Sequence, residues 1–582
     1  MRKVATFILI ATCCCAFWHG TPTLYVSPSG NDSNLCSISQ PCLTIAHAQT
    51  VARTQKASVV LRDGTYTIPA TLAFTSSDSG TVASPVIYQS YPGEHAIINA
   101  GTVVTGWSLF SGSIFRANVG TSVDFRQLYV NGVHVQRARG PANPAGWTPT
   151  AGGYTAPDST VAGYGNLTNV EIVSIGNWAM LRCLVLSGSG TTITMQTPCW
   201  TIRNAKSPGY GWASVAWVEN AFELMASGSW YLDRSAGFLY YWPPGGSMSG
   251  LTVTAPTVTD PITITGVSNF QLKNLTVSYS NWVLPNSGGV GYTGNISGAR
   301  WTDGTSNPSS SVPMDAAITV TGSTNIMLSH LELSHLGSAA VSILDGNSNV
   351  AVTSSRIDDI AGLPINVGRW STCPGVQENA VTIQYNLVPA GSQFDYTDSA
   401  VAFFICSKNT VVDHNELDGA HSFPIFFGFA FSNISQNANS SVTNNIFGNG
   451  CDTYTDCGGI YSSDPQSAGS TFPTGLNVSG NFWNGNGGAF IGFSCIYPDE
   501  LSSWNTYTGN VCRVSAGFVH MAFADTSNIT ITGNYSDSSS ILNNATGGGI
   551  TISGNTFSTS GAAALAIIAA AGVPSNITPG VQ

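Results

Sequence analysis

Apolar and polar residues alternate in short segments that recur along the second half of the chain. The segments are NFQLKNLTV, NTVVDHNEL, SSVTNNIFG, GLNVSGNFW, WNTYTGNVC, NITITGNYS and GITISGNTF. An alternation with a period of two residues predicts β-strands with one buried face. Each strand ends at an asparagine or a similar polar residue, and the recurring asparagines are Asn274, Asn415, Asn445, Asn481, Asn510, Asn534 and Asn555.

The spacing of these asparagines predicts a solenoid. From Asn415 onward the successive intervals are 30, 36, 29, 24 and 21 residues. The shorter intervals suit one turn of a parallel β-helix, and the longer ones suit a turn that carries a loop. Because turns stack about 4.8 Å apart, equivalent asparagines can hydrogen-bond as a ladder. A β-sandwich is the alternative, but antiparallel strands require no asparagine at one fixed position. We predict an all-β, right-handed parallel β-helix (a pectate-lyase-like solenoid) over residues 255–560.

The two ends of the chain have patterns of their own. In residues 21–102 a strand, a turn and a short helix precede SVVLRDGTYTI, which predicts an N-terminal cap and the first coils. A helix at the open end of a solenoid would cover exposed sheet edges. Residues 561–582 contain AAALAIIAAAG, which predicts a small helix in a C-terminal cap or tail.

The asparagine period is missing between residues 103 and 254. The segments FRQLYVNGVHVQRARGP and WVENAFELMASGSWYLDRSAGFLYYWPPGG alternate like antiparallel strands, with hairpin turns such as Asn131-Gly132. We therefore predict a β-rich, sandwich-like subdomain inserted beside the solenoid.

The N-terminal stretch MRKVATFILIATCCCAFWHG, residues 1–20, is typical of a secretory signal peptide. No later segment reaches the roughly 18 apolar residues that a membrane span needs. We therefore expect the protein to be secreted and extracellular.

Cysteine usage agrees with secretion. Of 13 cysteines, three fall in the signal peptide, and an even number remains. The remaining cysteines are near neighbours in sequence: Cys36 and Cys42, Cys183 and Cys199, Cys373 and Cys406, Cys451 and Cys457, Cys495 and Cys512. Such a set in a secreted chain predicts disulfides, although the sequence leaves their connectivity open. We do expect a Cys451–Cys457 bond, because six residues across a Gly- and Asp-rich turn permit closure. A metal site is disfavoured, since the sequence has no CxxC pair and no histidine at ligand spacing.

Composition and charge narrow the possible partners. Gly 63, many Ser, Thr and Asn, and only 8% charged residues are typical of short strands joined by tight turns. The net charge of −11, without basic runs, argues against nucleic acid and anionic membranes as partners. We expect a monomer that needs no cofactor.

An acidic cluster stands out in this weakly charged chain. CDTYTDCGGIYSSD, residues 451–464, places Asp452, Asp456 and Asp464 around two cysteines. Carboxylates are costly to confine unless they bind, titrate or cap something. The cluster is therefore a candidate functional site.

Two Ile-Tyr pairs are expected to lie in register. Tyr461 lies 16 residues after Asn445, and Tyr497 lies 16 residues after Asn481. If the isoleucine before each tyrosine faces the core, both tyrosines point outward, one above the other. They would form a wall for a sugar ring, or else ordinary aromatic stacking along a solenoid.

Five segments of the chain, taken in order, resemble a known group of proteins. The segments are YVSPSGND, FRQLYVNGVHVQRARGP, WYLDRSAGFLYYWP, DCGGIY and IYPDELSSW. They resemble secreted right-handed parallel β-helix proteins related to glycoside hydrolase family 141. The resemblance covers nearly the whole mature chain and implies hydrolysis of plant-type polysaccharides, since the family includes fucosidases and xylanases. It maps the family's aspartate pair onto Asp456, before Gly-Gly-Ile-Tyr, and Asp499, after the second Ile-Tyr. Glycoside hydrolysis normally uses two carboxyl groups across one bond.

The positions of these aspartates along the chain set a condition. Asp456 precedes its tyrosine by five residues, whereas Asp499 follows its tyrosine by two. The loop between Cys451 and Cys457 must therefore fold Asp456 back over the groove. Which aspartate is the acid is open; Asp456 is favoured, because a loop closed by cysteines can desolvate a carboxyl.

Further residues are expected to bind substrate. Asp464 and Glu500 each follow a tyrosine by three residues, so they align across coils and are the alternative catalytic pair or substrate ligands. His520, in FVHMAFAD, is expected on the coil after Asp499 in the same groove. Tyr461 and Tyr497 complete the set.

Two other functions remain open on this fold. A polysaccharide lyase would need Ca²⁺ held by carboxylates and a basic residue, and residues 450–525 offer only Arg513. A non-catalytic carbohydrate-binding or adhesin solenoid would use the aspartates to hydrogen-bond sugar hydroxyls. The main prediction is a secreted glycoside hydrolase; the sugar, the linkage, endo or exo action, and retention or inversion are left open.

Overall fold

The computed structural model describes residues 22–206, 214–294, 300–301, 311–369, 373, 375–419, 421–428, 437–448, 450–466, 469–485, 492–514 and 516–582. The predicted signal peptide, residues 1–20, lies outside the described residues. Within them, no helix is both long enough and apolar enough to cross a membrane.

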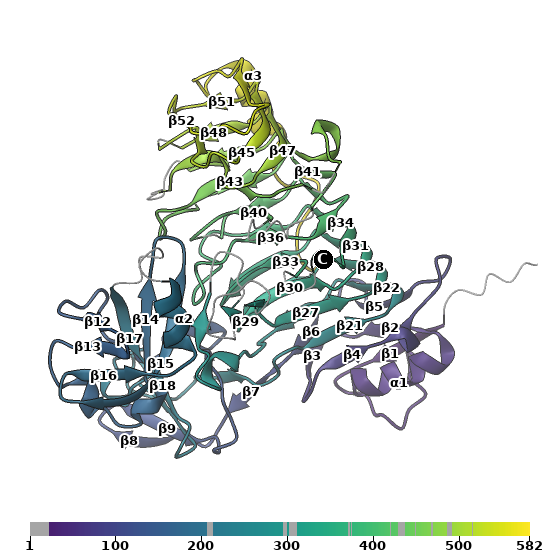
Figure 1. Cartoon of the computed structure of the whole chain (residues 1–582). Helices are drawn as coiled ribbons and strands as arrows, with labels where there is room; N and C mark the ends of the chain where they lie inside the picture. Colours follow the sequence, from purple (N-terminus) through teal and green to yellow (C-terminus); the bar gives the residue numbers. More distant parts are fainter. Residues whose placement is uncertain are drawn as a thin grey trace, which may run out of the picture.

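Three long sheets of parallel strands form a β-helix, which confirms the predicted fold class (Figure 1). The first sheet runs from β1 (Thr23–Val26) to β53 (Thr551–Ser553), and the second from β3 (Gly64–Thr67) to β51 (Tyr535–Ser536). The third consists of β4 (Leu72–Phe74), β21 (Ile262–Thr265), β27 (Ala316–Thr321), β30 (Ala339–Leu344), β33 (Ile365–Val367), β36 (Ala402–Phe404), β40 (Ile425–Gly428), β43 (Gly458–Ser463), β46 (Ser494–Pro498), β49 (Val519–Met521) and β52 (Ile541–Asn543).

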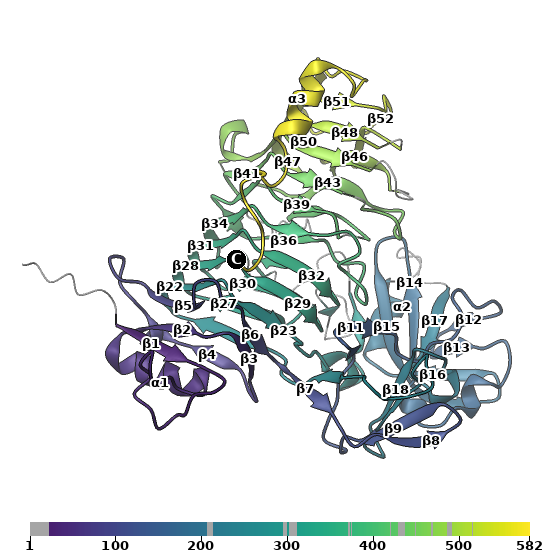
Figure 2. The ribbon, with the colours of Figure 1, turned by 180° about the vertical axis from the view of Figure 1, so that it is seen from behind.

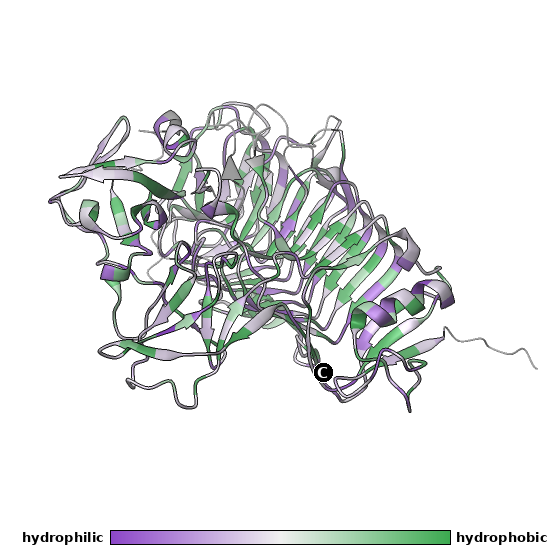
Figure 3. Cartoon of the chain, turned by 90° about the horizontal axis from the view of Figure 1, so that it is seen from below, coloured by the Kyte–Doolittle hydropathy of each residue, from purple (hydrophilic) through white to green (hydrophobic). Residues whose placement is uncertain are grey.

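Alternate residues of these strands fill the interior of the solenoid. In β41 (Ser440–Thr443) and β44 (Leu476–Ser479), Val442 and Val478 lie one above the other and are fully buried. Figure 3 shows apolar residues following one another from strand to strand of the solenoid. Burying a valine side chain stabilises a fold by about 1.5–3 kcal/mol, so one continuous core holds the stack of coils together.

The predicted asparagine ladder is present at one corner of the solenoid. Each side-chain Nδ2 donates to Oδ1 of the asparagine on the next coil, over 2.9 to 3.0 Å, in the order Asn386, Asn415, Asn445, Asn481, Asn510, Asn534 and Asn555. Each acceptor also receives the backbone N–H of the preceding asparagine, at 2.9–3.1 Å. The ladder therefore satisfies the polar groups of a buried turn.

One predicted member of the ladder is wrong. Asn274 has φ 56° and bonds the backbone of Gln582, with its Nδ2 donating to the carbonyl at 3.0 Å. In the early coils Ser355 occupies the ladder position instead, and its backbone N–H donates to Asn386 Oδ1 at 3.0 Å. The strand register aligns Lys273 with Ser329, and Ser329 with Thr353, so Asn274 stands one residue before the ladder position.

Two helices lie near opposite ends of the solenoid (Figure 1). Helix α1 (Ile45–Gln55) begins at the N-cap Thr44 and buries Ile45 in the first coils. Helix α3 (Ala562–Ala570) buries Ala564 against side chains of the second sheet. After α3 the tail runs back along the solenoid as far as Asn274.

The chain leaves the solenoid after β6 (Ala96–Asn99) and returns at β21. Between them β7 (Gly101–Val104) pairs with β20 (Val253–Pro256), and three antiparallel sheets form a body beside the middle coils (Figure 2). The predicted hairpin turn Asn131-Gly132 joins β10 (Leu128–Val130) to β11 (Val133–Val135) with positive φ at both residues. We call residues 101–256 the insert.

The insert also takes a strand from elsewhere in the chain. β24 (Tyr292–Thr293), which follows the return to the solenoid, pairs with β15 (Met180–Ser189) of the insert. This pairing could not be predicted from the sequence, because a two-residue strand has no periodicity.

A buried ion network fixes the insert to the solenoid. Arg182 of β15 bonds Glu171 at 2.7 Å and Glu219 at 2.8 Å within the insert, and Asp395 of a solenoid loop at 3.2 Å. Arg126 pairs with Glu171 at 2.9 Å. Because an unpaired buried charge is costly, the two bodies are held in one relative position.

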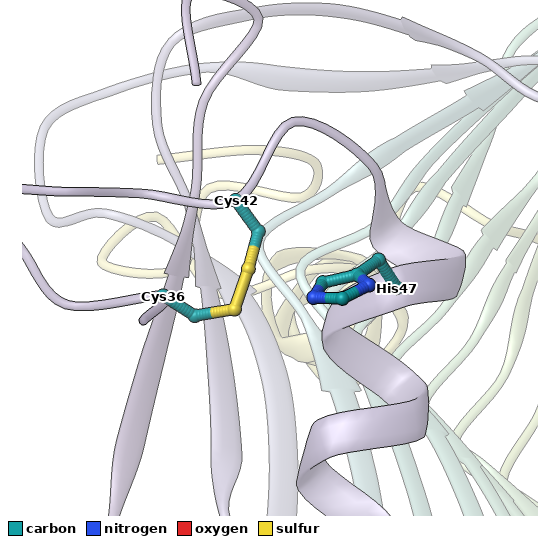
Figure 4. Close-up of side chains that lie close together, drawn as sticks. All are labelled: Cys36, Cys42 and His47. Atoms are coloured by element: carbon teal, nitrogen blue, oxygen red, sulfur yellow. A yellow bond between two sulfur atoms is a disulfide. The ribbon is translucent and has the colours of Figure 1, made fainter. Parts of the chain in front are cut away.

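Five disulfides join the cysteines that are neighbours in sequence. They are Cys36–Cys42, Cys183–Cys199, Cys373–Cys406, Cys451–Cys457 and Cys495–Cys512, with Cα–Cα distances of 4.7–6.1 Å. The expected Cys451–Cys457 bond is confirmed. His47 on α1 lies beside the Cys36–Cys42 sulfurs, with the three possible ligand atoms within 4.8 Å of one another (Figure 4). Since metals bind thiolates and these sulfurs are joined to each other, this group is structural.

Candidate functional site

The candidate site lies on β43 and β46, adjacent strands of the third sheet. Their register pairs Ile460 with Ile496 and Tyr461 with Tyr497, as the spacing predicted. Both isoleucines are buried in the solenoid core, and both tyrosines leave the sheet on its outer face. The sequence prediction of two in-register Ile-Tyr pairs is confirmed.

The tyrosines cross-link the two coils through the predicted aspartates. Tyr461 Oη donates to Asp499 Oδ2 at 2.5 Å, and Tyr497 Oη donates to Asp456 Oδ1 at 3.0 Å. The ring centroids lie 4.8 Å apart with the rings nearly perpendicular, at 73°. Each tyrosine thus holds the aspartate of the neighbouring coil, which brings the two carboxyl groups to one place.

The Cys451–Cys457 loop carries Asp456 back to this place. The Cα atoms of Cys451 and Cys457 lie 5.6 Å apart across the disulfide. The Asp456 backbone N–H donates to the carbonyl oxygen of Asn177 in the insert at 3.1 Å. The two glycines after the loop are required by close packing. A Cβ on Gly458 would meet Tyr497 Cβ at 2.8 Å, and one on Gly459 would meet the Trp483 ring at 2.0 Å.

Burial sets the electrostatics of the pair. Asp499 is 8% exposed, and its pKa is raised to about 7. Desolvation is the largest cause; the Tyr461 hydrogen bond opposes the shift, and the nearby carboxyls of Asp456 and Glu500 add to it. Desolvation also raises the pKa of Asp456, which is half-buried, and the Tyr497 hydrogen bond opposes this shift. Asp499 Oδ1 is buried and has no hydrogen-bond partner among the described residues. Asp499 is therefore a carboxyl that is partly protonated at neutral pH and has one free oxygen.

The two tyrosines of the predicted sugar-binding wall are buried in this structure. Tyr461 and Tyr497 are 7% and 3% exposed, since loops and the insert cover the outer face at these coils. Tyr461 stacks on Phe426 with centroids 4.4 Å apart and an interplanar angle of 25°. The alternative, aromatic stacking along the solenoid, describes the rings correctly, while their hydroxyls hold the aspartates.

The two residues of the alternative pair, Asp464 and Glu500, differ in burial. Asp464 is fully buried and accepts hydrogen bonds from Gln466 Nε2 and from Asn437 Nδ2 at 3.4 Å. Its substrate-binding role stays a prediction, and in this structure the side chain is covered. Glu500 is half-buried, and its pKa is raised by desolvation and by Asp525.

His520 lies where the sequence placed it, on the coil after Asp499. β49 pairs with β46, and the His520 ring meets Tyr497 edge-on, with centroids 4.7 Å apart at 72°. It is partly exposed and stacks on Phe493, with centroids 4.6 Å apart and planes 9° apart.

The sequence analysis missed several residues of the site. Phe426 precedes Tyr461 in the same outward row, and the dipeptide Ile425-Phe426 repeats the Ile-Tyr pattern, so that signal was available. Asn177 and Phe493 carry no such signal, because each enters the site from a loop. Asp452, of the original acidic cluster, pairs with His421 Nδ1 at 2.8 Å.

No protein-family model and no curated protein matches the chain. Among solved structures, one described as "Glycoside hydrolase" superposes with a TM-score of 0.75 at 21% identity, covering 96% of this chain and 100% of that chain. "The complex structure of XylC with xylose" has a TM-score of 0.46 at 12% identity, covering 86% and 69%. The native GH136 lacto-N-biosidase from Eubacterium ramulus has a TM-score of 0.43 at 10% identity, covering 92% and 67%. At 21% identity the first superposition establishes the fold alone: the chain is a parallel β-helix like that of the structure described as "Glycoside hydrolase".

Proposed function

We propose that the protein is a secreted glycoside hydrolase in which Asp456 and Asp499 are the two catalytic carboxyls. The observation that supports this most directly is the crossed pair of tyrosine–aspartate hydrogen bonds, which gathers two titratable groups from adjacent coils. Enzymes that cleave a glycosidic bond commonly use a pair of carboxyl groups, of which the general acid has a raised pKa. The resemblance to family 141 proteins supports a plant-type polysaccharide or its oligosaccharides as substrate.

The two aspartates have different environments, which assigns their roles. Asp499, with a pKa of about 7, is the general acid: its proton passes to the glycosidic oxygen as the bond to the anomeric carbon breaks. Asp456, the more exposed carboxyl, is the second group in this proposal: its ionised form either attacks the anomeric carbon or takes a proton from the attacking water. This assignment reverses the one favoured from the sequence, because burial by the coil outweighs closure of the loop.

The structure offers little support for a lyase. Arg513, the basic residue that the sequence provides in this region, lies over the Phe482 ring at 5.3 Å and donates to Thr559 O at 3.4 Å. These contacts hold it on the second sheet, away from the aspartates on the third. Proton abstraction by this residue would require it to leave both partners.

The decisive experiment compares activity of the wild-type protein with Asp456→Asn and Asp499→Asn on a panel of polysaccharides. We expect reducing ends without absorbance at about 235 nm, and loss of turnover by about two to four orders of magnitude in each variant. Added azide should restore turnover to Asp456→Asn. Near-normal turnover of both variants, or product absorbance in the ultraviolet, would reject the proposal. Near-normal turnover of either variant together with an inactive Glu500→Gln would also reject it, since Glu500 belongs to the alternative catalytic pair.

A further inference from the structure

The outward row of rings on the third sheet passes from buried to exposed beside the aspartates. Phe426, Tyr461 and Tyr497 occupy paired positions on β40, β43 and β46, and His520 follows on β49. The first three rings are buried, whereas His520 is partly exposed. The row therefore reaches solvent one strand beyond Asp499.

Phe493 stands at this opening with 42% of its surface exposed. One face of its ring stacks on His520, and the ring meets Tyr497 at 70° with centroids 6.0 Å apart. Its backbone N–H donates to Cys457 O at 2.8 Å, which ties it to the loop that carries Asp456. Phe493 is thus held by its backbone and by the His520 ring while much of its side chain is exposed.

An exposed aromatic ring that is held in place near two carboxyls suits a sugar. The C–H groups of one pyranose face are apolar and pack on an aromatic ring, while the hydroxyls around its edge hydrogen-bond polar groups nearby. Only one ring, that of Tyr497, separates Phe493 from the Asp456 carboxyl. Burial lowers the pKa of His520, so the ring behind Phe493 is neutral at neutral pH.

The charges around this opening are acidic. Asp456, Asp499, Glu500 and Asp525 form no salt bridge with any residue that the structure describes. The charge of Asp525 helps to raise the pKa of Glu500, and that of Asp456 helps to raise the pKa of Asp499. Like charges repel, so a uronate would be disfavoured at this opening relative to an uncharged sugar.

We propose that Phe493, backed by His520, is the platform on which a neutral pyranose ring of the substrate packs, next to the bond that Asp456 and Asp499 cleave. The position of the cleaved bond rests on the proposed function. The platform itself requires only a glycan ligand.

Affinity electrophoresis tests the platform without requiring turnover. The probes are arabinoxylan, xyloglucan and mixed-linkage β-glucan as neutral polymers, and polygalacturonate as the acidic one. We expect at least one neutral polymer to retard the wild-type protein, and Phe493→Ala to weaken that binding about tenfold, the effect of losing one stacked ring. Phe493→Tyr should retain binding. The control is Phe110→Ala, since Phe110 is 41% exposed but lies in the insert against Phe222 and Tyr240.

Three results would overturn the platform: no retardation of the wild-type protein by a neutral polymer, equal retardation of Phe493→Ala and wild type, or binding of polygalacturonate as tight as that of the neutral polymers. Kinetics on the retarding polymer separate this from the catalytic proposal. Hydrolysis with an unchanged KM in Phe493→Ala rejects the platform and leaves the hydrolase. Binding that depends on Phe493 without any release of reducing ends rejects the hydrolase and leaves the platform.

Discussion

At the scale of single residues, the ring and the hydroxyl of Tyr461 and of Tyr497 have different roles. The rings are buried in an aromatic cluster, where Tyr461 stacks on Phe426 at 4.4 Å. The hydroxyls project from this fixed base and hold Asp499 and Asp456. The carboxyls are therefore positioned by groups that the core immobilises, which is how an active site keeps its geometry before substrate arrives.

The raised pKa of Asp499 predicts a pH-dependent gain in stability for Asp499→Asn. In the folded protein this pKa is about 7, against 3.8 for an unperturbed aspartate, so the folded state binds the proton more tightly than the unfolded state. The stabilisation from the protonated carboxyl is complete below pH 3.8 and is lost as pH rises toward 7. Asparagine does not ionise, so the free energy of unfolding of the variant should rise relative to that of the wild type over this range, by an amount on the order of 4 kcal/mol.

Urea unfolding of both proteins at intervals from pH 4 to pH 8 measures this gain. Phe110→Ala, which changes an exposed side chain of the insert and no ionisable group, is the control, and its difference from wild type should stay constant with pH. A difference between Asp499→Asn and wild type that does not change with pH would show that Asp499 titrates normally.

At the scale of elements, the asparagine ladder fixes the register of the coils. Asn481 is buried; its Nδ2 donates to Asn510 Oδ1 at 2.9 Å, and its Oδ1 accepts from both the side chain and the backbone of Asn445, each at 2.9 Å. The Tyr461–Tyr497 pairing depends on the same register, since both tyrosines follow ladder asparagines by the same number of residues. A one-residue slip would send the tyrosines into the core.

Removing one rung should be costly. We expect Asn481→Ala to lower the free energy of unfolding by on the order of 3 kcal/mol, because Asn445 would keep a buried N–H and a buried amide without their acceptor. Asn274→Ala is the control from a similar sequence motif. Since Asn274 is off the ladder and bonds the terminal residue, its loss should cost about 0.5 kcal/mol. Equal effects in denaturant unfolding would contradict the structural distinction between the two asparagines.

At the scale of the whole molecule, the insert and the solenoid build the site together. The insert supplies Asn177, whose carbonyl accepts the Asp456 backbone N–H, and it helps to cover the tyrosine cluster with Val173 and Met180. Arg182 fixes this arrangement through its bonds to Glu219 and Asp395. The position of Asp456 thus depends on a contact between two bodies that are separate along most of the chain.

Arg182→Ala is therefore expected to affect both stability and activity. It leaves Asp395 without its buried cation, and breaking a buried ion pair costs about 3–5 kcal/mol. Activity should fall with it, since the insert would no longer hold the Asp456 loop in place. Arg356→Ala, which breaks the surface pair with Asp358, should cost less than about 1 kcal/mol and leave turnover unchanged. Thermal unfolding and specific activity, measured together, report both effects. If Arg182→Ala behaves like Arg356→Ala, the insert has no role in positioning the site.

Much of the architecture could be predicted because it repeats. In a parallel β-helix each coil buries its side chains against the coils next to it. The alternation of apolar and polar residues and the recurrence of Asn415, Asn445 and Asn481 are therefore visible in the sequence. The in-register tyrosines followed from the same arithmetic. Local spacing also sufficed for Cys451–Cys457, since six residues across a turn leave little freedom.

The burial of the site carboxyls and their hydrogen-bond partners could not be predicted, because both depend on which distant segments cover a residue. Asp464 and Asp456 both look like exposed turn carboxylates in the sequence, yet one is fully buried and the other lies half open beside Tyr497. The pKa of Asp499 is raised by a covering layer whose members lie far away in the chain, and Phe493 reaches the site through loop geometry. The sequence by itself determined the repeating solenoid and the register of the two coils, since these rest on neighbouring contacts. Only the tertiary structure decided which carboxyl is desolvated, because desolvation is a property of everything that surrounds a group.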